Sequence, residues 1–292
     1  VAANVAQPAG TAAFPQVASP DPVVAWMAEQ VDQDAIYQRM GDLTGEWLVT
    51  VRGNTTKITT RNTNSSTGIQ NATNYVYDYL QALGLTMESH RWGSATAPNI
   101  IGQKTGKTAP ADIYMITAHL DDMPTGSTAP GADDNASGSV GVLVAADILS
   151  QFEWNCTLRF ALWTGEEQGL LGSDKYAQRA KNNGETIKGV LNLDMIAWNT
   201  AGSTPDMDLN ANKNYPATVD LANQMASVIA AYDFDLVPEI LDYGEGASDH
   251  ASFWKYGYTA ILGIEDYYPN DHDFDPYYHK TTDKLSTLNL PY

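Results

Sequence analysis

The sequence predicts an α/β fold in which a single three-layer α/β/α domain contains a central mixed, mostly parallel sheet. Short apolar runs typical of buried strands alternate with helical segments, the pattern of a parallel sheet with helices on both faces. The composition agrees, since 43% of the 292 residues are hydrophobic and only 17% are charged. That apolar content suffices for one large core and argues against broad disorder.

The elements follow from local patterns along the chain. Residues 1–20 are rich in Ala, Pro, Gln and Ser without periodicity, which predicts a flexible lead-in and one domain over 21–292. Cap residues, Pro in a first turn and terminal Gly mark the helices. Helices are expected over 21–31, 35–40, 68–83, 138–149 and 173–180, and buried strands over 113–117, 158–163, 190–193 and 258–264.

The charge balance restricts the partners. The chain has 16 Lys+Arg against 35 Asp+Glu and a net charge of −19, which argues against nucleic acid and anionic membranes. The longest apolar stretch, Val140–Leu149, is too short to span a bilayer and contains Asp147. The one cysteine, Cys156, cannot build a thiolate zinc site. The chain begins at Val1 without a signal segment, so we expect a processed, secreted or periplasmic protein.

Histidines and carboxylates gather where the predicted strands end. Carboxylates that converge at one edge of a sheet repel one another unless a cation lies between them, so a multivalent metal is expected. Imidazole and carboxylate ligands without thiolates suit zinc and tolerate cobalt or manganese. The candidates lie in His119-Leu120-Asp121, Asp133-Asp134, Glu166-Glu167, Asp194, Ser248-Asp249-His250 and Tyr278-His279.

The residue pattern alone leaves two choices among these candidates open. Of the consecutive Glu166 and Glu167, only one can point into a metal pocket as a ligand, while the other can lie above an activated water. Three histidines occur late in the chain. His279 follows the last predicted strand and can return across its carboxyl end, whereas His250 precedes that strand and His272 lies in an acidic loop.

At these motifs the chain resembles the secreted bacterial dizinc aminopeptidases, the leucyl branch of metallopeptidase family twenty-eight, over roughly Gly68–Leu288. The resemblance implies a dizinc catalytic domain in which Asp133 bridges the ions and precedes a cis peptide bond. It also implies that Glu166 is the general base, that Asp121 orients His119, and that Tyr278 stabilises the tetrahedral oxygen. The implied ligands of two Zn²⁺ ions are His119, Asp133, Glu167, Asp194 and His279.

The expected function is zinc-dependent removal of the N-terminal residue from peptides with a free N-terminus, by a metal-activated water in a monomeric enzyme. A carboxypeptidase normally holds the substrate carboxylate with Arg, yet apart from Arg159 the motif loops contain none. A glutaminyl cyclase would keep one zinc, although every position for two is filled. An inactive binding module would be expected to have lost a ligand or the base.

Overall fold

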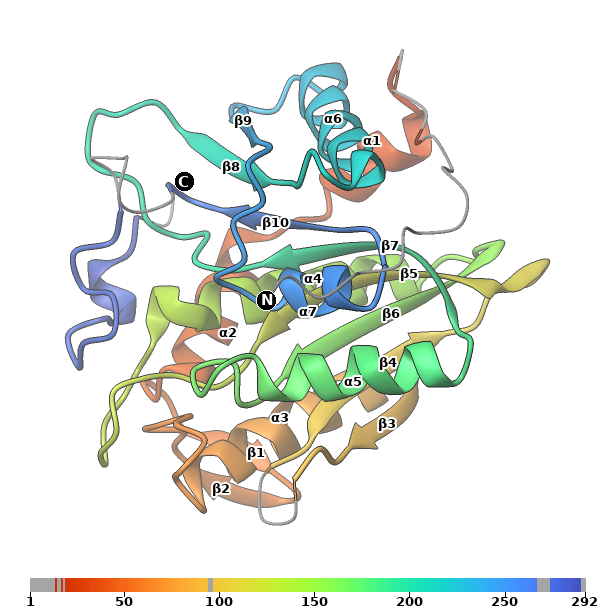
Figure 1. Ribbon diagram of the computed structural model, residues 1–292. Helices are drawn as coiled ribbons and strands as arrows, with labels where there is room; N and C mark the ends of the chain where they lie inside the picture. Colours follow the sequence, from red (N-terminus) through yellow and green to blue (C-terminus); the bar gives the residue numbers. More distant parts are fainter. Residues whose placement is uncertain (1–13, 15–16, 18, 94–96, 267–273, 290–292) are drawn as a thin grey trace, which may run out of the picture.

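The computed structural model describes residues 14, 17, 19–93, 97–266 and 274–289. Most of the predicted lead-in and the loop with His272 therefore lie outside the described residues. The central feature is a twisted sheet crossed by helices on both faces (Figure 1). The predicted three-layer α/β/α class is confirmed.

Eight strands form the central sheet in the order β3-β4-β6-β5-β7-β10-β8-β9. The middle strands β6, β5, β7 and β10 are parallel, whereas β3 and β4 on one side and β8 on the other join antiparallel. A separate hairpin pairs β1 (Val49–Val51) with β2 (Asn54–Thr56). The strands of the large sheet are β3 (Thr86–His90), β4 (Asn99–Lys104), β5 (Ala109–His119), β6 (Cys156–Trp163), β7 (Thr186–Leu193), β8 (Asp206–Asn210), β9 (Val237–Leu241) and β10 (Ala260–Ile264).

The helices begin and end where the sequence chemistry requires. Asp21 and Asp32 cap the first two helices, and Pro22 occupies the first turn of α1. Gly84, with φ of 78°, follows the end of α3. The helices are α1 (Pro22–Ala28), α2 (Gln33–Leu43), α3 (Gly68–Ala82), α4 (Gly138–Ser150), α5 (Leu171–Asn182), α6 (Pro216–Ala231) and α7 (His250–Lys255), with the kinked turn η1 (Ala132–Ser137) before α4 and a short turn η2 (Leu285–Thr287).

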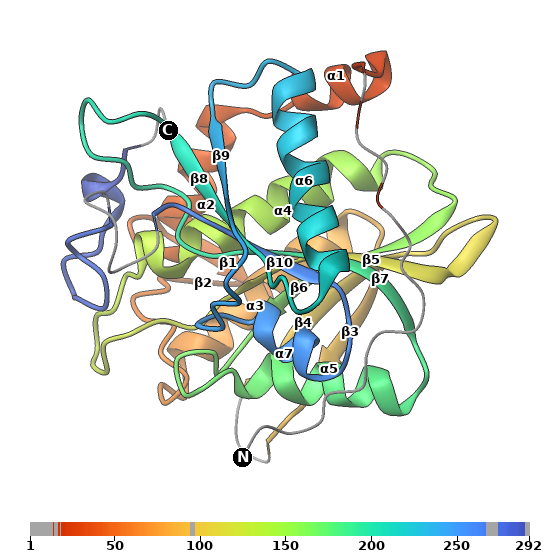
Figure 2. The same ribbon diagram turned by 45° about the horizontal axis from the view of Figure 1, so that its top comes forward.

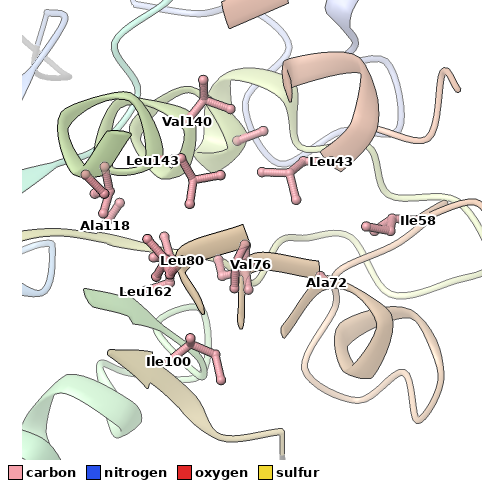
Figure 3. Close-up of a cluster of buried hydrophobic side chains, with 14 of the residues drawn as sticks. Leu43, Ile58, Ala72, Val76, Leu80, Ile100, Ala118, Val140, Leu143 and Leu162 are labelled. Atoms are coloured by element: carbon pink, nitrogen blue, oxygen red, sulfur yellow. The ribbon is translucent and has the colours of Figure 1, made fainter. Parts of the chain in front are cut away.

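Alternate residues of the central strands enter two separate cores. Ala118 of β5 faces the helices α2, α3 and α4, where it packs with Leu80, Val140 and Leu143 (Figure 3). Met115 points to the opposite face, toward α5 and α7. This two-sided burial explains the continuous apolar runs of the central strands. No helix within the described residues is both long and apolar enough to cross a bilayer.

The far edge of the sheet was not predicted. β8 and β9 form it together with α6, which lies across these outer strands in the turned view (Figure 2). The sequence of β8, Asp206–Asn210, alternates polar and apolar residues over only five positions, and Pro238 interrupts β9. Such short, polar edge strands lack the apolar run by which the central strands are recognised.

Candidate metal centre

The carboxyl ends of three neighbouring parallel strands carry four of the predicted site residues. His119 is the last residue of β5, Asp194 directly follows β7, and the loop after β6 holds Glu166 and Glu167. The strands end level, because His119 pairs with Trp163 of β6 in the parallel register. Side chains at such an edge can meet above it, where open α/β sheets bind ligands.

A first group of ligand atoms surrounds His119. Its Nε2 atom lies 3.1 Å from Oδ1 of Asp194 and 3.3 Å from Oδ1 of Asp134. All three side chains are buried, and their ligand atoms lie within 4.8 Å of one another. Asp134 reaches the group from the kinked turn η1.

A second group surrounds His279. Its Nε2 atom lies 3.1 Å from Oε2 of Glu167 and 3.2 Å from Oδ2 of Asp134. Asp134 therefore belongs to both groups and gives one carboxylate oxygen to each. This is the arrangement by which a carboxylate bridges two metal ions about 3.5–4 Å apart.

The residues present fit zinc in type and in spacing. Zinc binds imidazole nitrogen and carboxylate oxygen at about 2.0–2.2 Å in tetrahedral geometry, so two ligands of one ion lie about 3.3–3.5 Å apart. The nitrogen-to-oxygen distances of 3.1–3.3 Å in both groups are close to that spacing. In addition, Oε1 of Glu167 is buried without a hydrogen-bond partner. A bound cation would satisfy such an oxygen.

The carboxylates of the centre hold protons on its imidazoles. Burial alone would lower the pKa of His279, but its hydrogen bonds to Asp134 and Glu167 raise that pKa to about 10. Burial would raise the pKa of Asp134, yet hydrogen bonds from both imidazoles hold it below its usual range. Burial and the charge of Asp134 raise the pKa of Glu167 to about 7. A metal that binds here at neutral pH must therefore displace a proton from His279.

The prediction that Asp133 bridges the metals is wrong, because the structure gives that place to Asp134. Oδ1 of Asp133 accepts a hydrogen bond from the main-chain N–H of Ala197 at 2.9 Å, and its carboxyl group lies beside that of Glu265. Consecutive residues of the turn project in different directions, so only one of the two aspartates reaches the centre. The cis peptide bond likewise lies one residue later than predicted, between Asp134 and Asn135.

Asp121 lies behind His119, but its main-chain oxygen, not its carboxylate, orients the ring. Nδ1 of His119 lies 3.0 Å from the main-chain oxygen of Asp121 and 3.9 Å from its carboxylate, so the carbonyl makes the orienting hydrogen bond. The carboxylate instead accepts hydrogen bonds from the main-chain N–H groups of Glu166 and Glu167 at 3.2 and 3.3 Å, and from the Thr63 hydroxyl at 2.9 Å. Asp121 thus joins the loops of the two ligand groups.

A cavity of about 410 Å³ opens beside the two ligand groups. Glu166, the predicted base, lines this cavity, whereas Glu167 belongs to the second ligand group. Burial raises the pKa of Glu166 well above its usual value. Apolar side chains supply another part of the cavity wall, namely Met195, Ala247, Leu262, Ile264 and Phe274.

The late histidines differ in their surroundings. His250 is buried, its Nε2 lies 2.8 Å from the main-chain oxygen of Glu245, and its ring packs edge-on against Trp254. It belongs to neither ligand group. Tyr278 lines the cavity and stacks on His279 with ring centroids 3.7 Å apart. His272 lies outside the described residues.

Two residues support the centre through contacts that the sequence did not specify. The carboxylate of Asp283 accepts hydrogen bonds from the main-chain N–H groups of Asp133 and Asp134 at 2.9 and 3.1 Å. The hydroxyl of Ser248 donates to Oδ2 of Asp194 at 2.6 Å. Both residues lie within motifs that point to the centre, Tyr278–Asp283 and Ser248–His250. Proximity to a ligand motif is therefore the signal that would have found them.

The fold and the site together define an α/β protein with a centre of histidines and carboxylates at the carboxyl edge of its sheet. The family model described as Peptidase family M28 matches residues 99–291, and the chain belongs to that family. Leucine aminopeptidase 1 of Penicillium rubens is 29% identical over 261 residues, which cover 80% of this chain and 64% of that protein. The chain thus spans less than two thirds of that relative's length.

Solved structures give the same result for the fold. The LapA aminopeptidase of Legionella pneumophila superposes with a TM-score of 0.75 over 92% of this chain and 69% of that one, at 24% identity. BSAP, a zinc aminopeptidase from Bacillus subtilis, is 28% identical with a TM-score of 0.56, over 68% of this chain and 47% of that one.

Proposed function

We propose that the protein is an aminopeptidase that uses two zinc ions to hydrolyse the N-terminal residue from peptides. The observation that carries the proposal is the position of the Asp134 carboxylate. One of its oxygens lies in the group with His119 and Asp194, and the other lies in the group with Glu167 and His279. The similarity to a leucine aminopeptidase and to a zinc aminopeptidase supports both the metal and the reaction.

Zinc, when bound to these ligands, would supply Lewis acidity that polarises the scissile carbonyl and activates a water. Side chains of the cavity would carry out the proton transfer and stabilise the negative charge. The Glu166 carboxylate would accept a proton from the attacking water and pass it to the leaving amine. The Tyr278 hydroxyl, in the cavity wall, would donate a hydrogen bond to the oxygen that becomes negative. Asp121 would hold the loop of Glu166 through its main-chain N–H.

The cavity also suggests the substrate. Its carboxylates, Asp134, Glu166 and Asp194, favour a free α-ammonium group and disfavour a substrate carboxylate. None of the described lining residues is an arginine, which a carboxypeptidase would use. The apolar wall suits an aliphatic or aromatic first side chain. The same proposal includes a monomer, since both ligand groups come from one chain, and a secreted or periplasmic location, for which the acidic composition is the support.

The test is hydrolysis of leucyl-p-nitroanilide by the purified protein. We expect turnover that a chelator abolishes and added zinc restores, with two zinc ions per chain in the restored protein. Acetyl-leucyl-p-nitroanilide should not be cleaved, because acetylation removes the ammonium. Cleavage of the acetylated compound at a comparable rate, or release of C-terminal residues from a blocked peptide, would contradict the aminopeptidase assignment.

A further inference from the structure

The loop Thr164–Gly172 carries both Glu166 and Glu167. It leaves the end of β6, and its last two residues form the start of α5. Within the loop, the main-chain oxygen of Glu166 accepts hydrogen bonds from the N–H groups of Gly169 and Leu170 at 2.7 and 2.8 Å. These bonds curl the loop into a turn. The main-chain N–H of Leu171 also donates to the main-chain oxygen of Gly165 at 2.9 Å, and the Asp121 carboxylate accepts from the N–H groups of Glu166 and Glu167.

One further side chain bonds to both ends of the loop. Asn99, the first residue of β4, is fully buried beside the start of the loop. Its Oδ1 accepts a hydrogen bond from the main-chain N–H of Thr164 at 3.0 Å, and its Nδ2 donates to the main-chain oxygen of Gly172 at 2.9 Å. A single amide group therefore connects the first and last residues of the loop that holds both glutamates.

Both donor positions of this amide have partners, as does its oxygen. Nδ2 also lies 3.0 Å from Nδ1 of His90, and Oδ1 lies 3.3 Å from the hydroxyl of Thr164, whose shorter hydrogen bond goes to the main-chain oxygen of Ala97 at 2.9 Å. An asparagine side chain offers two donors and two acceptor lone pairs, so the Asn99 amide is held in one orientation. His90 itself is buried and packs edge-on against Tyr176, so this partner of the Asn99 amide is also held in place.

The loop is shaped around Asn99. A Cβ atom on Gly172 would lie 2.4 Å from Oδ1 of Asn99 and 2.2 Å from the main-chain oxygen of Thr164, so only glycine fits at this end. At the other end Gly165 has φ of 82°, and a Cβ atom there would lie 2.6 Å from the ring of Trp92. The Gly172 end of the loop thus meets the amide at a separation that tolerates no larger residue, whereas the Gly165 end is limited by Trp92.

We propose that Asn99 is a positioning residue that sets the loop so that Glu167 reaches the second ligand group and Glu166 faces the cavity. Asn99 touches neither glutamate and acts through the main chain at Thr164 and Gly172. Its influence should fall on the His279–Glu167–Asp134 group and should spare the His119–Asp134–Asp194 group, whose ligands come from other elements. The inference rests on the proposed zinc function, because it assigns Asn99 to one of the two zinc sites.

The experiment compares Asn99→Asp and Asn99→Ser with a matched control, Thr157→Val. Asn99→Asp keeps the acceptor for Thr164 but loses the donor to Gly172, and Asn99→Ser removes both contacts with the smaller side chain that is safer for folding. Thr157 is a buried residue near the start of β6, the strand that leads into the loop, where its hydroxyl accepts from the Gly106 N–H at 3.1 Å and donates to the Pro110 oxygen at 2.8 Å. Its replacement removes comparable side-chain to main-chain bonds far from the loop.

The zinc-free proteins are titrated with zinc against a chelating indicator, and kcat and KM are measured after reconstitution. In both Asn99 variants we expect one of the two zinc sites to lose affinity by about 10–100-fold, as replacement of groups behind metal ligands typically does. The other site should change by less than about twofold, and kcat should fall more than KM rises. Thr157→Val should bind both ions and turn over as the wild type does.

The outcomes separate the two proposals. A wild type that binds no zinc would overturn the proposed function and this inference with it. A wild type with two zinc ions and Asn99 variants of unchanged zinc affinity and kcat would overturn this inference alone. Equal losses in Thr157→Val would also overturn it, since the effect would then follow general destabilisation.

Discussion

The carboxylate of Asp283 accepts a hydrogen bond from the main-chain N–H of Asp134 at 3.1 Å, across 149 residues of sequence. Asp283 thereby holds the turn in which Asp133 faces Glu265 and Asp134 faces the imidazoles of the two ligand groups. A carboxylate that accepts two consecutive main-chain N–H groups is a rigid attachment, because both hydrogen bonds must break before the turn can rotate. The direction of the Asp134 side chain is therefore set from outside the centre.

The first prediction follows from that direction. Asp134→Asn should remove the shared carboxylate, and zinc content should fall below two per chain while activity drops by more than the ~10–100-fold typical of groups behind the ligands. Asp133→Asn is the matched control, since it changes the neighbouring carboxyl group and leaves every ligand in place. Zinc analysis after dialysis measures both. Full zinc in Asp134→Asn together with a loss in Asp133→Asn would restore Asp133 as the bridge.

The second prediction concerns the two adjacent glutamates. Glu166→Gln should keep its zinc but lose turnover by about 10²–10⁴, the usual contribution of a general base. Glu167→Gln should instead lose zinc from the group that contains His279, because its Oε2 lies 3.1 Å from that imidazole. Zinc stoichiometry and kcat of the two variants, measured side by side, distinguish these roles. A zinc-depleted Glu166→Gln with a fully loaded Glu167→Gln would reverse them.

The third prediction is a pH dependence of zinc affinity. Hydrogen bonds to Asp134 and Glu167 raise the pKa of His279 to about 10 against the effect of burial, so zinc must displace its proton at neutral pH. Affinity should rise between pH 6 and 8 by about tenfold per pH unit for each proton displaced. Calorimetry in buffers of different ionisation enthalpy counts the released protons. A pH-independent affinity with no proton release would contradict the assignment of His279 as a ligand.

The raised pKa of His279 has an opposite effect on the stability of the metal-free protein, which should fall as the pH rises. The folded state holds the His279 proton more tightly than the unfolded state, whose pKa is near 6.5. The resulting stabilisation is fully present below about pH 6.5 and is lost as the pH rises toward about 10. Adding zinc should therefore stabilise the protein more at pH 8 than at pH 6, which thermal unfolding with and without zinc would measure.

The fourth prediction concerns His250, which lies buried outside the centre. Burial lowers its pKa to about 4, so between pH 4 and 6.5 the unfolded chain binds a proton that the folded protein does not. Stability should rise with pH through this window by up to about 1.4 kcal/mol per pH unit from this residue. Urea unfolding of the zinc-free protein between pH 4.5 and 6.5 gives the slope. His250→Gln should flatten it, and an unchanged slope would show that other groups dominate.

The fifth prediction tests the start of η1. Gly131 has φ of 49°, and a Cβ atom there would lie 2.3 Å from the main-chain oxygen of Asp134. Gly53→Ala is the control, because Gly53 has φ of 78° with nothing within 4 Å of the added atom. The control should lose about 1–2 kcal/mol from the left-handed backbone alone. Gly131→Ala should lose more in urea unfolding and also bind zinc less tightly. Equal losses without a zinc effect would argue against this steric account.

Much of the centre could be predicted because its residues lie beside strands with a strong apolar signal. His119 ends β5 and Asp194 follows β7, and both strands are buried on two faces. Asp133 and Asp134 could not be separated in the same way, because both follow the same turn and their directions depend on Ala197, Glu265 and Asp283. These partners are remote in sequence, and no local periodicity indicates them.

Buried polar contacts were the least predictable part of the fold. Arg61 is fully buried, and its guanidinium donates to the main-chain oxygens of Leu43, Leu120, Pro130 and Gly131. In the sequence it follows a polar stretch that resembles an exposed loop. Whether an arginine is buried depends on carbonyl groups brought together by the tertiary fold, which composition and spacing cannot reveal.

Both ligand groups depend on a segment that is synthesised late. A ribosome that has released residues up to Asp194 has supplied the three side chains of the His119 group, but Asp134 also needs Asp283 to hold its turn, and the second group needs His279. A nascent chain would therefore acquire neither cation site in its final form until residues 279–283 had been released and had folded back onto the sheet. Under the proposed function, an incomplete chain would be unable to cleave its neighbours.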